Sequence, residues 1–527
     1  MLGNVTRFEI VFATLLLCAF ALMNSCSSKP TDMRSLVPAD TLVYLETNDL
    51  GAALQPIVDS KPFNEVAKKK PDLSALKGVQ LAVAITGFET SEEKVNDEQS
   101  VGKIQPHFVA IADTHAWQFQ AEGFAEKKLG AFVADIYDSE PTLEKIEKGG
   151  GHYLTWTAKD GRKAYALVVG SLIYFGNDAS AIEKCQAVKR GEADSIAKTG
   201  KVQPADAGTL ATGYVSQDGV AQIANVFSLK FAQNASEEGE VQSALAGILP
   251  KVLRNNITDI RWTQNTFDAG LVDRWQINMP PDVANAFVKT MQPRDGTDEK
   301  LGSFVPVDAD GVTKYNLKDP LSAWQSLVGV VVKGLDYGEQ RAVYLSVGAI
   351  FEPYAVEKPD LFLSGASSAV VTVKQKIGDD ENAVVIARGD VKNALASDLH
   401  LHNPGENTFG GLIWKASDGD TSAAVVGPWI AGNSELLDKC VRANLSLAGF
   451  RNSSKYQQFV STDASVFTIG HDPDSAKAIA EMLSDPNENS KTTEYVTETR
   501  FNQFGMERKT TSDFGFIGWI IAQLAEE

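Results

Sequence analysis

An aspartate and two histidines near residue 400 form the set most able to bind a metal in this chain. The stretch SDLHLHN, residues 397–403, holds two of the six histidines. If it is extended, Asp398, His400 and His402 lie on one face, because alternate side chains of a strand share a face. Two imidazoles and a carboxylate are ligands that zinc and similar divalent metals accept. The alternative, which we favour, is a polar strand or loop edge, and we expect no cofactor.

Two other stretches resemble binding loops less closely. DADG, residues 308–311, begins like a calcium loop, but Val312 and Asp319 stand where an oxygen ligand and a bidentate glutamate are needed. GGGHY, residues 149–153, follows EPTLEKIEK, which we expect to be a helix. Three glycines there are expected to end this helix rather than to cradle an anion.

The motifs of common enzyme classes are missing from the sequence. It contains no G-x-S-x-G elbow, P-loop, H-E-x-x-H or G-x-G-x-x-G. The many pairs of aspartate and glutamate do not single out an acid–base couple without geometry. The sequence therefore indicates no catalytic residue. A hydrolase whose site is assembled from distant residues stays open as an alternative.

The segments that must position any site occur twice along the chain. ALVVGSLIYFGNDASAIEKCQAV (166–188) and AAVVGPWIAGNSELLDKCVRA (423–443) share VVG, Ile, GN and KC in the same order. Three further pairs are collinear with this one: 36–58 with 304–328, 205–227 with 462–483, and 258–279 with 492–513. Self-similarity of this kind is the signature of a repeated structural unit. We predict a tandem duplication.

Each repeat is predicted to be α+β. Strand candidates such as VQLAVAIT (79–86) and HFVAIAD (107–113) come in adjacent groups rather than in strict alternation with helices. This pattern favours an antiparallel sheet with helices packed on one face. The predicted boundaries are a signal peptide at 1–25, a tether at 26–35, repeat one at 36–294, a hinge at 295–303 and repeat two at 304–527.

The two internal cysteines fall at matching places in the two repeats. Cys185 and Cys440 each follow a lysine within a predicted helix. We expect both to be small buried apolar residues. A disulfide between the copies is the alternative, and it requires the two α-carbons to lie within about 7 Å of each other.

The stretch LMNSCSSKP, residues 22–30, follows an apolar run and places small residues around Cys26. This is the pattern of a secretory signal peptide whose apolar region is too short to span a bilayer. Leu22–Cys26 resembles the lipobox of bacterial lipoproteins. The resemblance implies that Cys26 carries the lipid, and Ser27 in place of an acidic residue implies sorting to the outer membrane. The alternative is an ordinary signal peptide, with Cys26 an incidental thiol.

A second resemblance concerns the repeats themselves. PADTLVYLETNDL (38–50) and GNSELLDKCVRANLSLAG (432–449) resemble segments of an uncharacterised family of exported bacterial proteins, known as a domain of unknown function. The resemblance implies export and a fold, and it implies no reaction.

Composition and charge narrow the class of partner. Apolar residues make up 43% of the chain and charged residues 22%, which is typical of a soluble globular protein. The net charge of −19 disfavours nucleic acid and anionic headgroups as electrostatic partners.

Together these features favour a lipid-anchored protein of the bacterial envelope, facing the periplasm or the surface, with a non-enzymatic binding role. The junction of the repeats is the natural place for a ligand cleft. The expected partners are the membrane, through the anchor, and an envelope protein or a small apolar ligand. A carrier of lipid or another apolar molecule is the first alternative, and an envelope hydrolase is the second.

Overall fold

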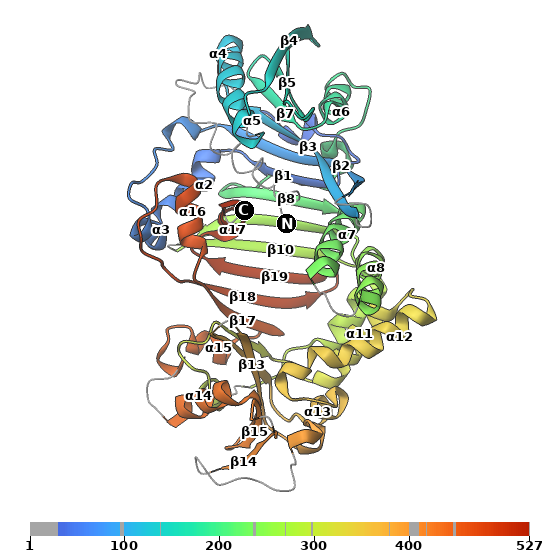
Figure 1. Ribbon diagram of the computed structural model, residues 1–527, viewed down its shortest axis with the longest axis vertical. Helices are drawn as coiled ribbons and strands as arrows, with labels where there is room; N and C mark the ends of the chain where they lie inside the picture. The colour runs from blue at the N-terminus through green and yellow to red at the C-terminus, as the bar shows by residue number, and fades with distance from the viewer. Residues whose placement is uncertain are drawn as a thin grey trace.

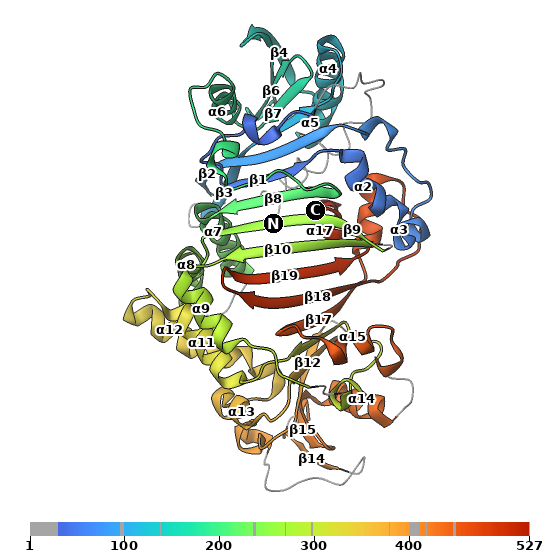
Figure 2. The ribbon, with the colours of Figure 1, turned by 180° about the vertical axis from the view of Figure 1, so that it is seen from behind.

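The computed structural model describes residues 30–94, 100–137, 139–234, 239–268, 270–296, 299–378, 380–399, 411–417, 419–445 and 450–525. These residues form an α+β structure around an antiparallel sheet of 19 strands (Figure 1). The molecule is elongated, and its central strands run across the long axis, as the view from behind also shows (Figure 2). The predicted α+β class with an antiparallel sheet is confirmed.

The strands pair in one continuous path from end to end of the molecule. In the first half the spatial order is β4 (Thr142–Lys148), β5 (Gly151–Thr157), β6 (Lys163–Val169), β7 (Leu172–Gly176), β3 (Ser100–Asp113), β2 (Gln80–Lys94), β1 (Val43–Thr47), β8 (Thr209–Ser216), β9 (Asp259–Phe267) and β10 (Gly270–Asn278). The path continues through the second half in the order β19 (Gly505–Ser512), β18 (Thr493–Asn502), β17 (Val466–Asp472), β11 (Gly311–Tyr315), β12 (Val370–Ile377), β13 (Asp380–Ala387), β16 (Trp429–Asn433), β15 (Thr421–Val425) and β14 (Leu412–Lys415).

The two halves meet where β10 pairs with β19. The pairing runs from Leu271 opposite Ser512 to Asn278 opposite Gly505, with Arg274 opposite Lys509 in the middle. Outward from this junction the strands follow in the same order on both sides. Among the described strands, β4 alone has no counterpart, since the second half ends at β14 where the first continues from β5 to β4.

Helices cover both faces of the sheet. Leu81 and Val83 of β2 pack in a core cluster with α2 (Leu50–Asp59), α3 (Lys61–Val66), α16 (Ser475–Leu483) and α17 (Gly515–Ala525). Ala82 and Ala84 belong to another cluster, with α6 (Ala179–Lys189), on the opposite face. The prediction of helices on one face is therefore wrong. The strand residues here are apolar almost without interruption, and such a run buries both faces.

The last helix of each half packs over the other half. α9 (Pro281–Thr290) follows β10 but lies against β18, β19 and α11 (Pro320–Val332). α17 follows β19 but lies against β10 and α2. α16 likewise packs against α3, on the left in Figure 1. Each half thus supplies part of the other half's cover.

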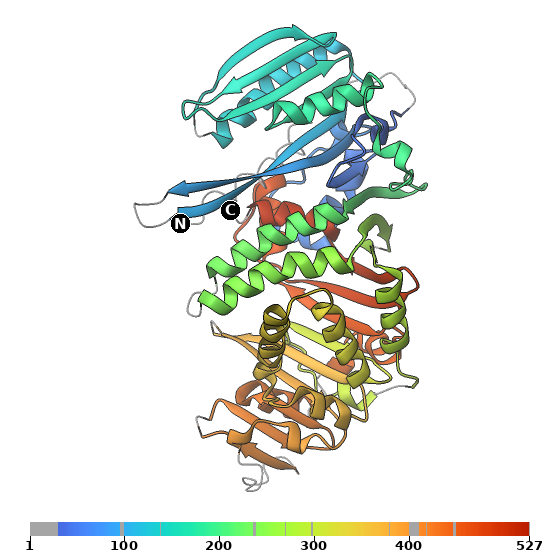
Figure 3. The ribbon, with the colours of Figure 1, turned by 90° about the vertical axis from the view of Figure 1, so that its right-hand side faces the viewer.

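The remaining helices complete the layers. They are α4 (Gln118–Phe124), α5 (Gly130–Ile136), α7 (Gln217–Asn234), α8 (Gly239–Asn256), α10 (Glu299–Gly302), α12 (Tyr337–Val347), α13 (Pro359–Gly365), α14 (Ser434–Leu445) and α15 (Tyr456–Ser461). α7 and α8 run side by side as the long green pair of Figure 3. α10 lies inside the predicted hinge, and its Leu301 is buried in the core of the second half. Within the described residues, no helix has the length and apolar content that a membrane span requires.

Candidate ligand-binding site

Helix α11 positions a large apolar site. Asp319 caps its N-terminus by accepting a hydrogen bond from the Ser322 backbone N–H at 2.9 Å, and Pro320 occupies the first turn. Ser322, Gln325, Ser326 and Gly329 lie on one side of the helix, and its other sides are apolar. On the apolar sides, Leu327 is 40% exposed and Trp324 is only partly buried. An apolar helix face normally packs against other elements, whereas these two side chains line a cavity.

A cavity of about 730 Å³ lies between this helix and the sheet. Its floor is formed by β11, β12 and β13 together with β18 and β19. Its other walls come from α11, α13 and the 3-10 turns η5 (Gly348–Ile350) and η6 (Glu352–Tyr354). Most lining side chains are aliphatic or aromatic, including Trp324, Ile350, Phe351, Phe362, Val385 and Phe501. The volume falls within the range of about 300 to 1,000 Å³ that is usual for small-molecule sites.

A second apolar pocket of about 380 Å³ lies beside the first. It shares Trp324, Leu327 and Ile350 with the cavity and extends between α8 and α12. Leu249 and Val252 of α8 come from the first half of the chain, so this part lies between the halves. Helix α11 thus lines both spaces.

The polar groups of the cavity gather around β11, β12 and η6. Lys374 Nζ lies 2.6 Å from Glu381 Oε1, and this hydrogen bond raises the pKa of the lysine. Burial raises the pKa of Tyr315 and of Tyr354, and Thr372 is a hydrogen-bonding neighbour of both phenols. At neutral pH the lysine is therefore charged and both phenols keep their protons.

The corresponding place in the first half is filled. Thr47 pairs with Leu81 as Tyr315 pairs with Val370, which sets the correspondence between β1–β2 and β11–β12. The space beside Leu81 measures only about 40 Å³, because Trp262 of β9 and two isoleucines of α17, Ile517 and Ile520, occupy it.

A second difference lies on β13. Val109 pairs with Gly176, and Val384 pairs with Gly432 of the matching GN motif. Phe108 in the first half and Ala383 in the second are therefore equivalent. The phenylalanine is packed in a core cluster, whereas the alanine lines the cavity.

The predicted metal site is only partly within the described residues. Asp398 lies in a 3-10 turn, η8 (Ser397–Leu399), rather than in an extended strand. His400 and His402 lie outside the described residues, as does Cys26. In the described part of the chain, no three histidine, cysteine, aspartate or glutamate side chains gather as metal ligands would.

The internal cysteines are buried free thiols, as predicted. Cys185 on α6 and Cys440 on α14 are both 0% exposed and belong to different core clusters. Burial raises the pKa of Cys185 to about 12 and also raises the pKa of Cys440. The alternative of a disulfide between the copies is wrong.

The two loop-like motifs have structural roles. DADG precedes β11, as its failed ligand set suggests, and Asp308 Oδ2 accepts a hydrogen bond from Gln375 Nε2 at 3.0 Å. EPTLEKIEK is a helix in our prediction, which is wrong, because residues 142–148 form strand β4. Gly149 and Gly150, both with positive φ, turn this strand into β5. Two such residues are what a tight hairpin turn needs.

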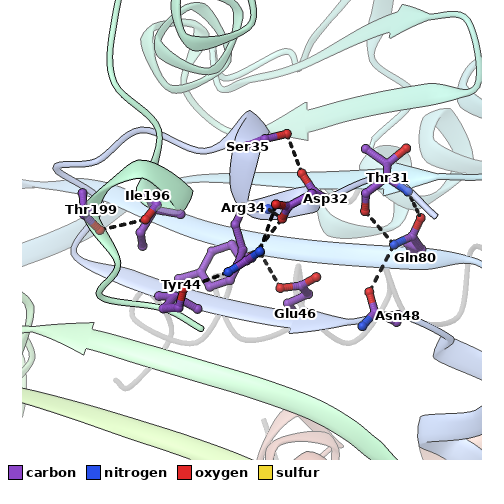
Figure 4. A network of polar contacts seen from close by, with 11 residues as sticks. Thr31, Asp32, Arg34, Ser35, Tyr44, Glu46, Asn48, Gln80, Ile196 and Thr199 are labelled. Atoms are coloured by element: carbon purple, nitrogen blue, oxygen red, sulfur yellow. Dashed lines mark hydrogen bonds and ion pairs between the residues drawn. The ribbon is translucent and has the colours of Figure 1, made fainter. Parts of the chain in front are cut away.

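A polar network lies near the start of the described chain (Figure 4). Gln80 Nε2 donates to the Thr31 carbonyl at 2.9 Å, and Tyr44 Oη donates to Glu46 Oε2 at 2.8 Å. Burial raises the pKa of Glu46, while the tyrosine and the nearby charge of Arg34 act in the opposite direction. These groups satisfy one another, and they fasten the segment around Thr31 to β1 and β2.

Comparison with known proteins adds no assignment, since no family model, no curated protein and no solved structure matches this chain. The cavity therefore stands on its geometry alone. Sequence reasoning missed it, because its walls come from seven or more separate segments. One signal was present: PLSAWQSLVGVVV, residues 320–332, has a wide apolar face that includes Trp324 and Leu327.

Proposed function

We propose that this protein is a lipid-anchored component of the bacterial envelope that binds an elongated apolar molecule under helix α11. The observation that carries the proposal is the 730 Å³ cavity with its nearly continuous apolar walls. Buried apolar contact supplies affinity at about 25 cal/mol per Å² removed from water. A carrier of lipid or another apolar molecule is the role that such a site supports best.

The polar groups of the cavity favour binding over hydrolysis. A general base works best with a pKa near the operating pH. The pKa of Lys374 is raised by Glu381, and burial raises the pKa of both tyrosines, so none of the three is a base at neutral pH. Among the described residues, no histidine, cysteine or serine lines the cavity.

We further propose that the two halves arose by tandem duplication and then diverged. The proposal is supported by the four collinear sequence matches and by the common order of strand pairing outward from β10 and β19. Under this proposal the first copy keeps a filled interior. The second copy has gained a cavity through smaller side chains such as Ala383 and through the helices between β11 and β12.

Attachment through Cys26 is the remaining part of the proposal. The lipobox-like stretch supports it, and about two or three acyl chains give stable anchoring. Thr31 Oγ1 donates to Asp113 Oδ2 at 2.6 Å, so the folded body begins five residues after the cysteine. An extended chain of that length spans at most about 18 Å. The body would sit close to the membrane, within reach of lipid.

One measurement tests anchor and ligand together. The protein is extracted from the envelope of its native host in mild detergent, and its mass is recorded intact and under gentle conditions. We expect the intact mass to equal that of residues 26–527 plus acyl chains. Under gentle conditions we expect an additional mass from bound ligand, which disappears on denaturation. A mass without acyl chains, from a soluble fraction, contradicts the anchor. Absence of any adduct after delipidation and re-exposure to a lipid extract contradicts the binding role.

A substitution that fills the cavity tests whether the ligand binds there. Ala383→Phe introduces the residue that the first half has at the equivalent position, and we expect it to weaken ligand binding by at least about tenfold. Ala52→Phe, at an exposed position of α2, is the matched control and should leave binding unchanged. Equal adducts on both variants would contradict this site.

A further inference from the structure

The cavity is apolar except around one cluster, and this asymmetry defines its ligand. We propose that the ligand is a single-chain amphiphile with a carboxylate headgroup, of the fatty-acid class, whose head binds Lys374, Tyr315 and Tyr354. This inference rests on the proposed binding function and specifies its ligand.

The strand register brings the polar groups together. Thr372 and Lys374 alternate on β12 and therefore share the face that lines the cavity. Lys374 is opposite Ala383 on β13. Glu381 precedes Ala383 by two residues on the same strand. Tyr315 comes from the end of β11 and Tyr354 from η6, so four separate segments converge on one place.

The groups that converge are mainly hydrogen-bond donors. A lysine ammonium has three donors and no acceptor, and each protonated phenol has one donor. A carboxylate accepts only, with about four lone-pair sites on two oxygens. Hydrogen bonds between such charged partners are about twice as strong as neutral ones. The cluster thus offers a positive charge and several hydrogen-bond donors, which complement the negative charge and the acceptor sites of an ionised carboxylate.

Glu381 is the carboxylate that pairs with Lys374, with Oε1 2.6 Å from Nζ. The Lys374 and Glu381 side chains are 52% and 66% exposed, so their ion pair sits at the cavity mouth, in contact with solvent. Exposed pairs of this kind contribute only about 0 to 1 kcal/mol. A ligand carboxylate can therefore replace Glu381 at little cost, and the glutamate can turn to water.

The test measures displacement of a fluorescent fatty-chain probe from the delipidated full-length mature chain at neutral pH. The competitors share a sixteen-carbon chain and differ in the head: hexadecanoate, hexadecanol, hexadecyltrimethylammonium and a lysophosphatidate. We expect hexadecanoate to bind most tightly. Lys374→Met should weaken hexadecanoate binding by about two- to fivefold, as for loss of an exposed ion pair, and leave hexadecanol binding unchanged.

Two further variants sharpen the result. Lys376→Met changes the next exposed lysine of β12, which does not line the cavity, and should have no effect. Glu381→Gln removes the carboxylate that competes for Lys374 and should increase the affinity for hexadecanoate about two- to fivefold.

The possible failures separate the two proposals. If hexadecanoate and hexadecanol bind equally well, and Lys374→Met leaves both affinities unchanged, the carboxylate proposal is overturned. The proposal of an apolar binding site then still stands. Tightest binding of the ammonium compound or of the lysophosphatidate also overturns it. If none of the four displaces the probe, and Ala383→Phe binds the probe as the wild type does, both proposals fail.

Discussion

Asp273 lies one residue from the centre of the β10–β19 junction and is 2% exposed. Its Oδ1 accepts hydrogen bonds from Trp262 Nε1 at 2.8 Å and Gln264 Nε2 at 3.1 Å, and its Oδ2 accepts one from the Phe516 backbone N–H at 2.8 Å. Burial nevertheless raises the pKa of Asp273 to about 6. One buried acid thus connects β9, β10 and α17.

The raised pKa of Asp273 predicts a pH dependence of stability. Below pH 4 the carboxyl is protonated in both folded and unfolded chains. Between about pH 4 and 6 the unfolded carboxyl ionises first, so the free energy of unfolding falls, by about 3 kcal/mol from this group. Above pH 6 the loss is complete.

Asp273→Asn tests this pH dependence. The variant cannot ionise, and its amide opposes the Phe516 N–H, so at pH 4 it should be less stable than the wild type by about 1 to 3 kcal/mol. The difference should shrink as the pH rises to 6, as urea unfolding at several pH values would show. Parallel curves for the two proteins would contradict the assignment. Asp360→Asn, at an exposed site on α13, is the control.

At this scale the sequence predicts some residues well and others not at all. Cys185 and Cys440 could be assigned to the core because they recur in matching apolar helices. The role of Ala383 could not be predicted, since an alanine in a strand is ordinary and its meaning depends on which helices lie above it. The same holds for Lys374 and Glu381, which are two charges among many.

Among the elements, α11 determines the site. Asp319 caps α11 by accepting a hydrogen bond from the Ser322 backbone N–H at 2.9 Å. Asp49 caps α2 in the same way, from the Ala52 backbone N–H at 2.9 Å. The two caps are therefore a matched pair, one beside the cavity and one beside the filled interior.

Asp319 also accepts a hydrogen bond from Ser322 Oγ at 2.6 Å, so its removal should destabilise the protein at least as much as removal of Asp49, and the two removals should affect binding unequally. Asp319→Ala and Asp49→Ala should each lower the free energy of unfolding by about 1 kcal/mol. Only Asp319→Ala should weaken ligand binding, because it loosens the first turn, where Pro320 and Ala323 line the cavity. Denaturant unfolding together with probe titration measures both effects. Equal loss of binding in the two variants would indicate that the cavity is not the site.

Element prediction succeeded where periodicity and turn residues agreed. The strand candidates at 79–86 and 107–113 correspond to β2 and β3. EPTLEKIEK failed because its charges and aliphatic residues fit a helix as well as an exposed strand, and the pairing of β4 with β5 decided the outcome. Between β1 and β2 the first half has only α2, α3 and one 3-10 turn, whereas the second half has α11, α12, α13 and two 3-10 turns between β11 and β12, so the repeat pattern gave little guidance there.

Over the whole molecule, the exchange of terminal helices makes each half depend on the other. Phe514, Ile521 and Ala522, from the end of the chain, are buried in a cluster made largely of first-half residues. Fully burying a large apolar side chain contributes about 1.5 to 3 kcal/mol. The whole folded state of a domain is typically stable by only about 5 to 15 kcal/mol.

Truncation after Asp513 should therefore unfold the first half, although it removes only second-half sequence. We expect loss of the cooperative thermal transition and strong binding of a hydrophobic dye. Truncation after Ala525, which removes only the last two residues, should behave as the full chain. A folded first half in the shorter protein would contradict the exchange.

The β10–β19 junction has a consequence for the ancestry of the chain. Under the proposed duplication, a protein with a single copy had a free edge at β10 and a terminal helix without a sheet to cover. Two such chains could pair these edges antiparallel and exchange these helices, giving a two-fold symmetric dimer in which the same surface meets itself. Fusion of the two genes would then have released each copy to change alone. A cavity in one copy beside a filled interior in the other is what an ancestral homodimer, bound by its symmetry, could not have had.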